Sequence, residues 1–148
     1  MAYYRGENMK IKKIKDLSSE YEGYFIITDG LKCVESMCVS LPLPDNRIPK
    51  IGSLVSCLYA FFLDDNPTIK KLQRQSEHKY RLKKKGLLGM SYYVRGCILD
   101  SDKYLVKVFG FIISLEYLYG AEYCCSKKFD FANGDWISFT VNRFDVEI

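Results

Sequence analysis

Apolar and polar residues alternate in short runs along much of the chain, a pattern typical of β-strands with one buried face. In the first third, the apolar run Gly23 to Thr28 is followed by Asp29-Gly30, a strong hairpin turn, and by a returning segment, Leu31 to Leu41. Leu54 to Leu63 is apolar on both faces. We expect it to be a central strand, or one covered on its outer side.

The last third predicts a second set of strands. Tyr92 to Leu99 is expected to be a strand and Asp100 to Lys103 a turn. Tyr104 to Tyr117 is predicted as one long strand with Gly110 in its middle. Glycine at such a position indicates a bulge or a sharp bend.

The closing strand, Trp136 to Ile148, alternates most clearly, with polar residues on one side and apolar residues on the other. Trp136 and Phe144 lie on the wetter side, where they either cover a loop, the favoured interpretation, or stand exposed as partner anchors. The main core is predicted to be lined by Val55, Cys57, Ile137, Phe139 and Val141.

A weak internal repeat relates the two sets of strands. Gly52 to Phe62 matches Gly134 to Phe144 at a constant offset of 82 residues, and a hairpin-like unit precedes each segment. Such self-similarity predicts two related structural units packed together. At 148 residues the chain has the size of one domain. We therefore expect a single domain, residues 1–148, with repeat units at about 22–63 and 92–148 and a connector at 64–91.

The connector is predicted to be helical. Asn66 and Pro67 are typical of a helix start, and the cations of Lys83 to Lys85 followed by Gly86 are typical of a helix end. The apolar stripe between them is thin. An alternative is a hairpin arm, because His78 to Lys83 alternates as a strand does.

A hairpin, a long strand bent at Gly110 and a closing strand introduced by Gly134-Asp135 resemble the oligonucleotide/oligosaccharide-binding (OB) barrels. We therefore expect a mainly β fold, an OB-like or similar small barrel or sandwich. OB-like folds bind nucleic acids, sugars or proteins, so the resemblance selects no ligand. In general character alone the chain also resembles bacterial toxin-neutralising immunity proteins, which tend to be small, cytosolic, aromatic-rich and without catalytic residues.

Composition agrees with a β protein, because 15% of the residues are aromatic, including 12 Tyr and 9 Phe. The chain has no uninterrupted apolar run of about 18 residues, and its first residues lack the apolar segment of a signal peptide. These features predict a cytoplasmic protein with no membrane partner. The stretch that begins at Met9 resembles a start of its own, which would make the preceding residues an extension.

The sequence offers little catalytic chemistry. His78 is the only histidine, and no nucleophile elbow, phosphate-binding glycine loop or zinc-protease motif is present. The acids at Asp64-Asp65 and at Asp100 and Asp102 are more typical of turns than of acid/base pairs. We expect no enzyme activity and no cofactor.

The six cysteines are expected to be reduced, because nothing in the sequence routes the chain out of a reducing compartment. Their close pairs, Cys33 with Cys38 and Cys124 with Cys125, do not have the spacing of a zinc site. No metal site is predicted.

Positive charge is concentrated in one block. The net charge is +4, yet Lys70 to Lys85 contains eight basic residues and one acidic residue. Such a block is either a solvated face or a surface for an anionic partner. Its candidate partner-binding cations are Lys70, Lys71, Arg74, Lys79, Arg81, Lys83, Lys84 and Lys85. The candidate aromatic anchors are Tyr80, Tyr92 and Tyr93.

Two binding functions remain. The favoured one is a non-catalytic protein-binding module whose partner presents an acidic surface, for which a toxin-neutralising immunity protein is one concrete form. The alternative is a nucleic-acid-binding OB-like domain in which the basic block contacts phosphates and the tyrosines stack on bases. The confinement of positive charge to the connector favours the first.

Overall fold

The computed structural model describes residues 9–16, 23–38, 50–86, 89–120 and 128–146. Their backbone is mainly β-strand, which confirms the mainly β part of the predicted fold class. In chain order the elements are β1 (Lys10–Asp16), β2 (Gly23–Thr28), β3 (Cys33–Cys38), β4 (Leu58–Phe61), β5 (Lys70–Lys71), the 3-10 helix η2 (Gln75–Glu77), β6 (Arg81–Lys84), β7 (Tyr92–Asp100), β8 (Leu105–Val108), β9 (Phe111–Ser114), α1 (Glu116–Tyr119), β10 (Trp136–Val141) and β11 (Arg143–Val146).

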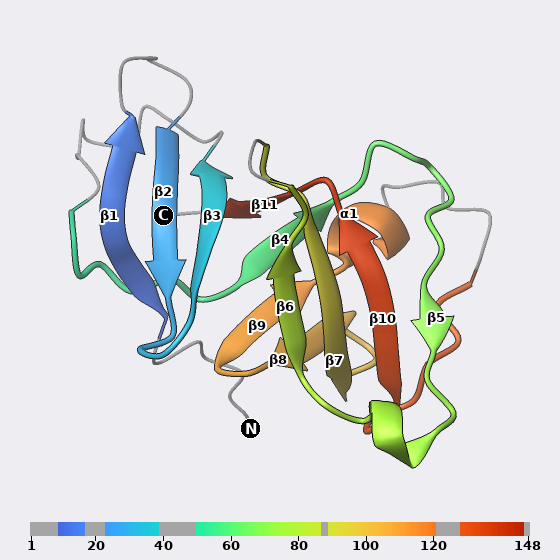
Figure 1. Cartoon of the computed structure of the whole chain (residues 1–148). Helices are drawn as coiled ribbons and strands as arrows, with labels where there is room; N and C mark the ends of the chain where they lie inside the picture. Colours follow the sequence, from blue (N-terminus) through green and yellow to red (C-terminus); the bar gives the residue numbers. More distant parts are fainter. Residues whose placement is uncertain (1–8, 17–22, 39–49, 87–88, 121–127, 147–148) are drawn as a thin grey trace.

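All eleven strands belong to one sheet of order β1-β2-β3-β11-β4-β9-β8-β7-β10-β5, with β6 also paired to β7. Figure 1 shows β1, β2 and β3 on one side of the molecule and β6, β7, β10 and β5 on the other. The end strands β1 and β5 do not pair in the described residues, so the sheet is not closed there. The expected OB-like barrel is therefore not confirmed.

One hydrophobic core joins the two sides of the sheet. It contains Phe25 of β2 together with Val94 of β7 and Ile137 of β10, all fully buried. Of the residues predicted to line the core, Val55, Ile137, Phe139 and Val141 are at most 2% exposed, and Cys57 is half-buried against them. The prediction of the core is confirmed for these residues.

Strand β7 organises the right-hand side of Figure 1. Along one edge it pairs with β10, and along the other it pairs first with β6 and then with β8. The change of partner occurs at Gly96. A Cβ atom at this position would lie 2.6 Å from the Lys107 carbonyl oxygen and 2.7 Å or less from side-chain carbons of Val106 and Val108. Glycine is required because β8 approaches the backbone so closely.

The structure does not confirm the internal repeat. The segment with Leu58 to Phe61 forms β4, which pairs with β11 and β9. The matched closing segment forms β10, which pairs with β7 and β5, and the start of β11, which pairs with β3 and β4. Because strands related by a structural repeat should have equivalent neighbours, the similarity of the two segments reflects a shared strand pattern alone.

The prediction of a helical connector is wrong. Asp64 accepts a hydrogen bond from the Asn66 N–H in a turn, and the chain continues as β5, η2 and β6. Strand β5 pairs with β10, and β6 pairs with β7. A thin apolar stripe stabilises a helix poorly, whereas the edges of two strands offer backbone partners. The alternative of a strand after His78 is confirmed for Arg81–Lys84.

The predicted long strand from Tyr104 to Tyr117 is also wrong. The chain reverses at Phe109-Gly110 to form the β8–β9 hairpin, in which Val108 faces Phe111, and then forms α1. Phe109 has a φ of +53°, a conformation that an aromatic residue rarely adopts. Glycine in this strand pattern thus marks a turn.

The closing strand is divided at Asn142 into β10 and β11. The Asn142 side-chain oxygen accepts a hydrogen bond from the Leu63 N–H, and its own N–H donates to the Phe61 carbonyl. The interruption changes which face points inward. Phe144, expected on the wetter side, is therefore fully buried in the core.

Asp29 joins the turns of two hairpins. One of its carboxylate oxygens accepts hydrogen bonds from the N–H groups of Leu31 and Lys32, at 2.9 and 2.7 Å. The other accepts one from the Gly110 N–H at 2.8 Å. Burial raises the pKa of Asp29, but the backbone hydrogen bonds together lower it by more, so the pKa lies below its ordinary value. A Cβ atom on Gly110 would lie 2.9 Å from this carboxylate.

We predict that Asp29→Asn destabilises the protein by about 1–3 kcal/mol at neutral pH, because an amide oxygen cannot replace all three charge-assisted bonds. Because the pKa of Asp29 is lower in the folded state than in the unfolded state, its charge stabilises the fold at pH values above the unfolded-state pKa. This stabilisation is lost as the pH falls through the folded-state pKa. The difference in unfolding free energy between wild type and variant should therefore shrink as the pH falls below 3.8, the ordinary pKa of this carboxyl group. Urea unfolding across pH measures it.

The control is Asp100→Asn, because the Asp100 carboxylate accepts a hydrogen bond from Asp102 within its own turn. This variant should lose less stability than Asp29→Asn. An Asp29→Asn difference that stays constant down to about pH 2 would contradict a structural role for the charged carboxylate.

Two buried serines give a second prediction. Ser36 is fully buried, and its hydroxyl has no hydrogen-bond partner among the described residues. Ser114 is also buried, but its hydroxyl accepts a hydrogen bond from the Glu116 N–H at the start of α1. Ser36→Ala should leave stability unchanged or raise it by about 1 kcal/mol, whereas Ser114→Ala should lower it by about 1 kcal/mol. Denaturant midpoints test both, and equal losses would contradict the assignment.

Candidate functional site

The structure divides the predicted cations between two edge strands, β5 and β6, on the right-hand side of the sheet in Figure 1. Lys70 and Lys71 form β5 beside β10, and Arg81, Lys83 and Lys84 lie on β6 beside β7. Between these edges run β7 and β10. The basic block therefore flanks a sheet surface that two other strands complete.

One row of directly opposite residues crosses all four strands. Lys70 is opposite Ser138, Ser138 is opposite Arg95, and Arg95 is opposite Arg81. Residues opposite each other in a sheet place their side chains on the same face. This row thus brings three cations to one surface.

Neighbouring rows extend this surface. Two residues along, Thr140 is opposite Tyr93 and Tyr93 is opposite Lys83. In the other direction Cys97 is opposite Lys107 of β8. Both lie on the same face as Arg95, because Cys97 is two residues after Arg95 on the strand. We call the surface formed by Lys70, Arg81, Lys83, Arg95 and Lys107, with Tyr93 among them, the basic face.

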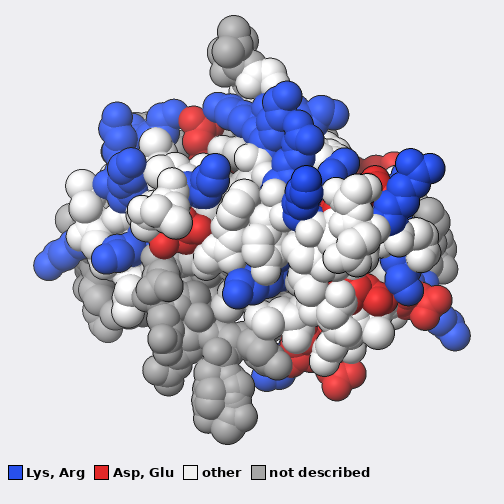
Figure 2. Space-filling view, turned by 60° about the horizontal axis from the view of Figure 1, so that its bottom comes forward, with Lys and Arg blue, Asp and Glu red and all other residues white. Residues whose placement is uncertain are grey.

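The basic face is not neutralised from within. None of its five cations forms an ion pair with an acidic residue in the described part of the chain. Arg81 and Arg95 are directly opposite, a like-charge arrangement that destabilises a sheet. Figure 2 shows one side of the molecule on which Lys and Arg side chains are widely spread, with smaller groups of Asp and Glu between and below them.

Arg95 and Tyr93 hold each other in place. The Arg95 Nε donates a hydrogen bond of 2.9 Å to the Tyr93 hydroxyl, and the guanidinium carbon lies 5.7 Å from the tyrosine ring centroid. Both side chains are half-buried. The pair therefore presents a cation and an aromatic ring in one defined arrangement.

A second aromatic group lies beside the basic face. Trp136 stacks on His78 with ring centroids 5.7 Å apart and planes 9° apart, and Tyr80 packs against it at 5.0 Å. His78 Nε2 is 2.9 Å from the Leu72 carbonyl oxygen. Burial, followed by the nearby Cys97, raises the pKa of Tyr80. Trp136 thus covers the segment before β6, in agreement with the prediction that it covers a loop.

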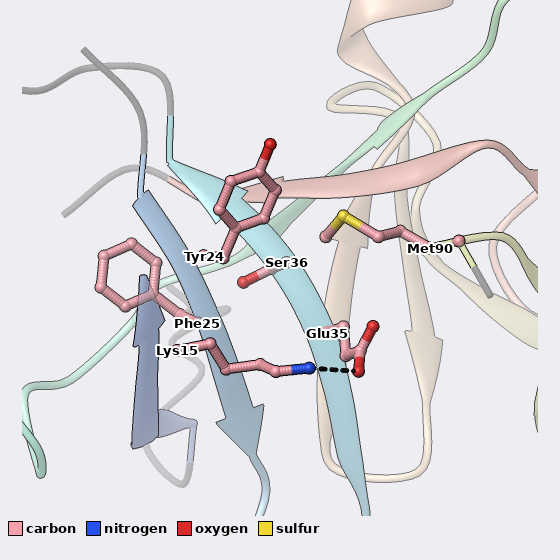
Figure 3. A pocket seen from close by; sticks show the side chains of 7 residues that line it. Lys15, Tyr24, Phe25, Glu35, Ser36 and Met90 are labelled. Carbon is pink, nitrogen blue, oxygen red and sulfur yellow. Dashed lines mark hydrogen bonds and ion pairs between the residues drawn. The ribbon is translucent and has the colours of Figure 1, made fainter. Parts of the chain in front are cut away.

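Two of the predicted cations have structural partners. Lys71 lies 3.3 Å from the Asp135 carboxylate, and Lys84 lies 3.0 Å from that of Glu35. Glu35 also pairs with Lys15 at 3.0 Å, at the wall of a pocket of about 350 Å³ (Figure 3). Burial raises the pKa of Glu35, but its hydrogen bonds to the two lysines bring it below its ordinary value. Lys84 thereby ties β6 to β3.

The other predicted residues are dispersed. Arg74, Lys79 and Lys85 are exposed. Arg74 and Lys79 lie between β5 and β6, whereas Lys85 follows Lys83 by two residues, bonds through its N–H to the Ser91 carbonyl and lies at the margin of the basic face. Tyr92 is 5% exposed, packs against Phe144, and its hydroxyl accepts a hydrogen bond from the Glu35 N–H. A partner cannot reach this buried ring, so Tyr92 is not an anchor in the folded chain.

Sequence reasoning missed Arg95 and Lys107, because both lie outside the basic block. The period-2 alternation of β7, which buries Val94 and Gly96, could have placed Tyr93, Arg95 and Cys97 together on the outer side. Only the strand pairing shows that β6 and β5 bring their cations to that same side.

Other chemistry is sparse in the residues that the structure describes. They contain no group of three or more His, Cys, Asp and Glu side chains placed to hold a metal ion. Cys33, Cys38, Cys57 and Cys97 are not in disulfides, and Cys124 and Cys125 lie outside the described residues. No helix within the described ranges is long and apolar enough to cross a membrane.

Comparison with protein-family models, curated proteins and solved structures found no match.

The like charges of the basic face yield a testable prediction. Arg81→Gln should leave stability unchanged or raise it by about 0.2–1 kcal/mol at low salt, because it removes the repulsion with Arg95. The gain should vanish at about 0.5 M salt, where exposed charges are screened. Lys84→Gln on the same strand is the control and should destabilise, because Glu35 then loses a partner. A loss of stability in Arg81→Gln at low salt would show that Arg81 is structurally required.

Proposed function

We propose that the protein is a non-catalytic binding module whose basic face docks on an acidic surface of a protein partner. The observation that carries this proposal is the unneutralised row formed by Lys70, Arg95 and Arg81. Such a row weakens the sheet when the protein is alone. An acidic partner would offset the repulsion and gain charge-assisted hydrogen bonds from the guanidinium groups.

The side chains also suit a protein interface. Arginine and tyrosine are enriched among the residues that dominate protein–protein binding energies. Arg95 and Tyr93 already contact each other, so less side-chain freedom is lost on binding. The exposed lysines around them, such as Lys83 and Lys107, would speed the approach of an acidic surface.

Nucleic acid is the competing partner, because the same cations could contact phosphates. Non-specific binding of single strands also depends on aromatic rings on which bases stack. Here the rings are already engaged by the protein: His78 lies parallel to Trp136, and the Arg95 guanidinium lies near the face of Tyr93. This arrangement favours a protein partner over a single strand.

A toxin-neutralising immunity protein is one concrete form of the proposed function. It would act in the cytoplasm and cover the active site of its partner without chemistry of its own. In this form an adjacent reading frame should encode a secreted toxin, and that toxin should be the protein that binds the basic face.

The prediction is tested by charge reversal. A variant with Arg81→Glu and Arg95→Glu should associate at least about tenfold more slowly with the partner, because steering and the central contacts are both lost. The partner is captured from native lysate with immobilised wild-type protein at about 0.15 M salt, identified, purified and measured by biolayer interferometry. A variant with Lys10→Glu and Lys13→Glu, two exposed residues of β1 at the other end of the sheet, has the same net charge and an intact basic face, and it should bind within about twofold of wild type.

Oligonucleotides supply the opposing test. Mixed-sequence single- and double-stranded 20-mers should bind only weakly, with Kd of about 10⁻⁴ to 10⁻⁶ M and steep salt dependence. Submicromolar binding at about 0.15 M salt, lost in the Arg81→Glu, Arg95→Glu variant, would overturn the protein-binding proposal in favour of nucleic acid.

A further inference from the structure

A pocket of about 490 Å³ lies beside β4, β11 and α1. Its lining includes Phe61 at the end of β4 and Phe62 after it, together with Tyr117 and Leu118 of α1. The volume lies within the range of small-molecule sites, which are usually apolar with a few placed polar groups. None of the residues of the basic face lines this pocket.

The pocket contains a cation held in a fixed position. Arg143 is opposite Phe61 in the β4–β11 pair, and its guanidinium carbon lies 4.1 Å from that ring centroid. The Arg143 Nε donates a 2.7 Å hydrogen bond to Asp145 Oδ1, and a terminal nitrogen lies 3.4 Å from Oδ2. Asp145 is 3% exposed, whereas the Arg143 side chain is 30% exposed. The buried carboxylate therefore orients a guanidinium that a ligand can reach.

Arg143 keeps capacity for a ligand. A guanidinium has five N–H donors in a planar fork that matches a carboxylate. Asp145 engages one edge of that fork, and no other acceptor binds Arg143 within the described residues. The remaining N–H groups can therefore bind a second carboxylate, one supplied by a ligand.

A second charge makes the site asymmetric. Asp65 also lines the pocket, is exposed, and has no hydrogen-bond or ion-pair partner in the described part of the chain. Arg143 and Asp145 neutralise each other, so the pocket with Asp65 is negative overall. A simple organic anion would be repelled by this negative charge, whereas a ligand with both a carboxylate and an ammonium group would complement both Arg143 and Asp65.

We propose that this pocket binds a free α-amino acid with an apolar side chain. The ligand carboxylate pairs with the open side of Arg143, and the ammonium group pairs with Asp65. The side chain lies against Phe62, Tyr117 and Leu118, where apolar contact contributes the remaining affinity. A peptide fits less well, because its terminal charges belong to different residues.

Ligand variants test the proposal by calorimetry on the full chain. L-phenylalanine and L-leucine should bind, with glycine weaker because it lacks the apolar contact. N-acetyl-L-phenylalanine, which lacks the ammonium group, and L-phenylalaninamide, which lacks the carboxylate, should each bind about tenfold or more weakly than L-phenylalanine.

Protein variants assign the two charges. Asp65→Asn should weaken L-phenylalanine about fivefold or more but should not weaken N-acetyl-L-phenylalanine, because that ligand has no ammonium group to lose and its carboxylate is no longer repelled. Asp64→Asn, at the neighbouring exposed carboxylate outside the pocket, is the matched control and should change neither. Arg143→Lys should weaken L-phenylalanine but not L-phenylalaninamide, because lysine cannot reproduce the planar fork.

The Asp65 variants keep the test decisive if Arg143→Lys fails to fold. No binding of L-phenylalanine to wild type at about 10 mM would overturn the proposal, as would equal affinity for L-phenylalanine and its N-acetyl form. An acetylated peptide ending in phenylalanine that binds as tightly as the free amino acid would also overturn it, because the pocket would then recognise a carboxyl terminus alone.

Discussion

The fold depends on how closely β8 can approach β7 at Gly96. At this residue β7 changes its partner from β6 to β8 while continuing to pair with β10 on its other edge. Backbone and side-chain atoms of β8 occupy the space where a Cβ would stand. Because β6 and β8 share one edge of β7, the cations of β6 and Lys107 of β8 reach the same outer surface, and Lys107 joins the basic face only through this change of partner.

Charge in this protein is sorted by position in the sheet. Lys84 and Lys71 bind Glu35 and Asp135 and thereby tie edge strands to the rest of the molecule. Arg81, three residues before Lys84, instead faces another arginine. The same basic segment thus contributes structural ion pairs at some positions and unneutralised charge at others. A sheet places residues with period 2, so neighbours in sequence acquire opposite roles.

Hydrogen bonds from side chains to turns hold the hairpins in register with one another. Asp29 binds the turn of the β8–β9 hairpin through Gly110, and Asn142 binds the segment that follows β4. Each bond satisfies a backbone N–H in a region where the strand ladders stop. The interruption at Asn142 also places Arg143 opposite Phe61, and the pocket beside α1 results from that register.

The alternation of apolar residues by itself determined the mainly β fold, the early hairpin and the core around Ile137, Phe139 and Val141, because burial of one strand face is a local, periodic property. Strand pairing is not local. In place of the helix expected after Asn66, the chain forms β5 and β6, which pair with β10 and β7. The expected repeat is not confirmed, because β4 and β10 have different neighbours. Pairing also brought Arg95 opposite Arg81, although the chain separates them by 14 residues. The basic block was visible in the sequence, but only the tertiary structure decided which of its charges share a surface.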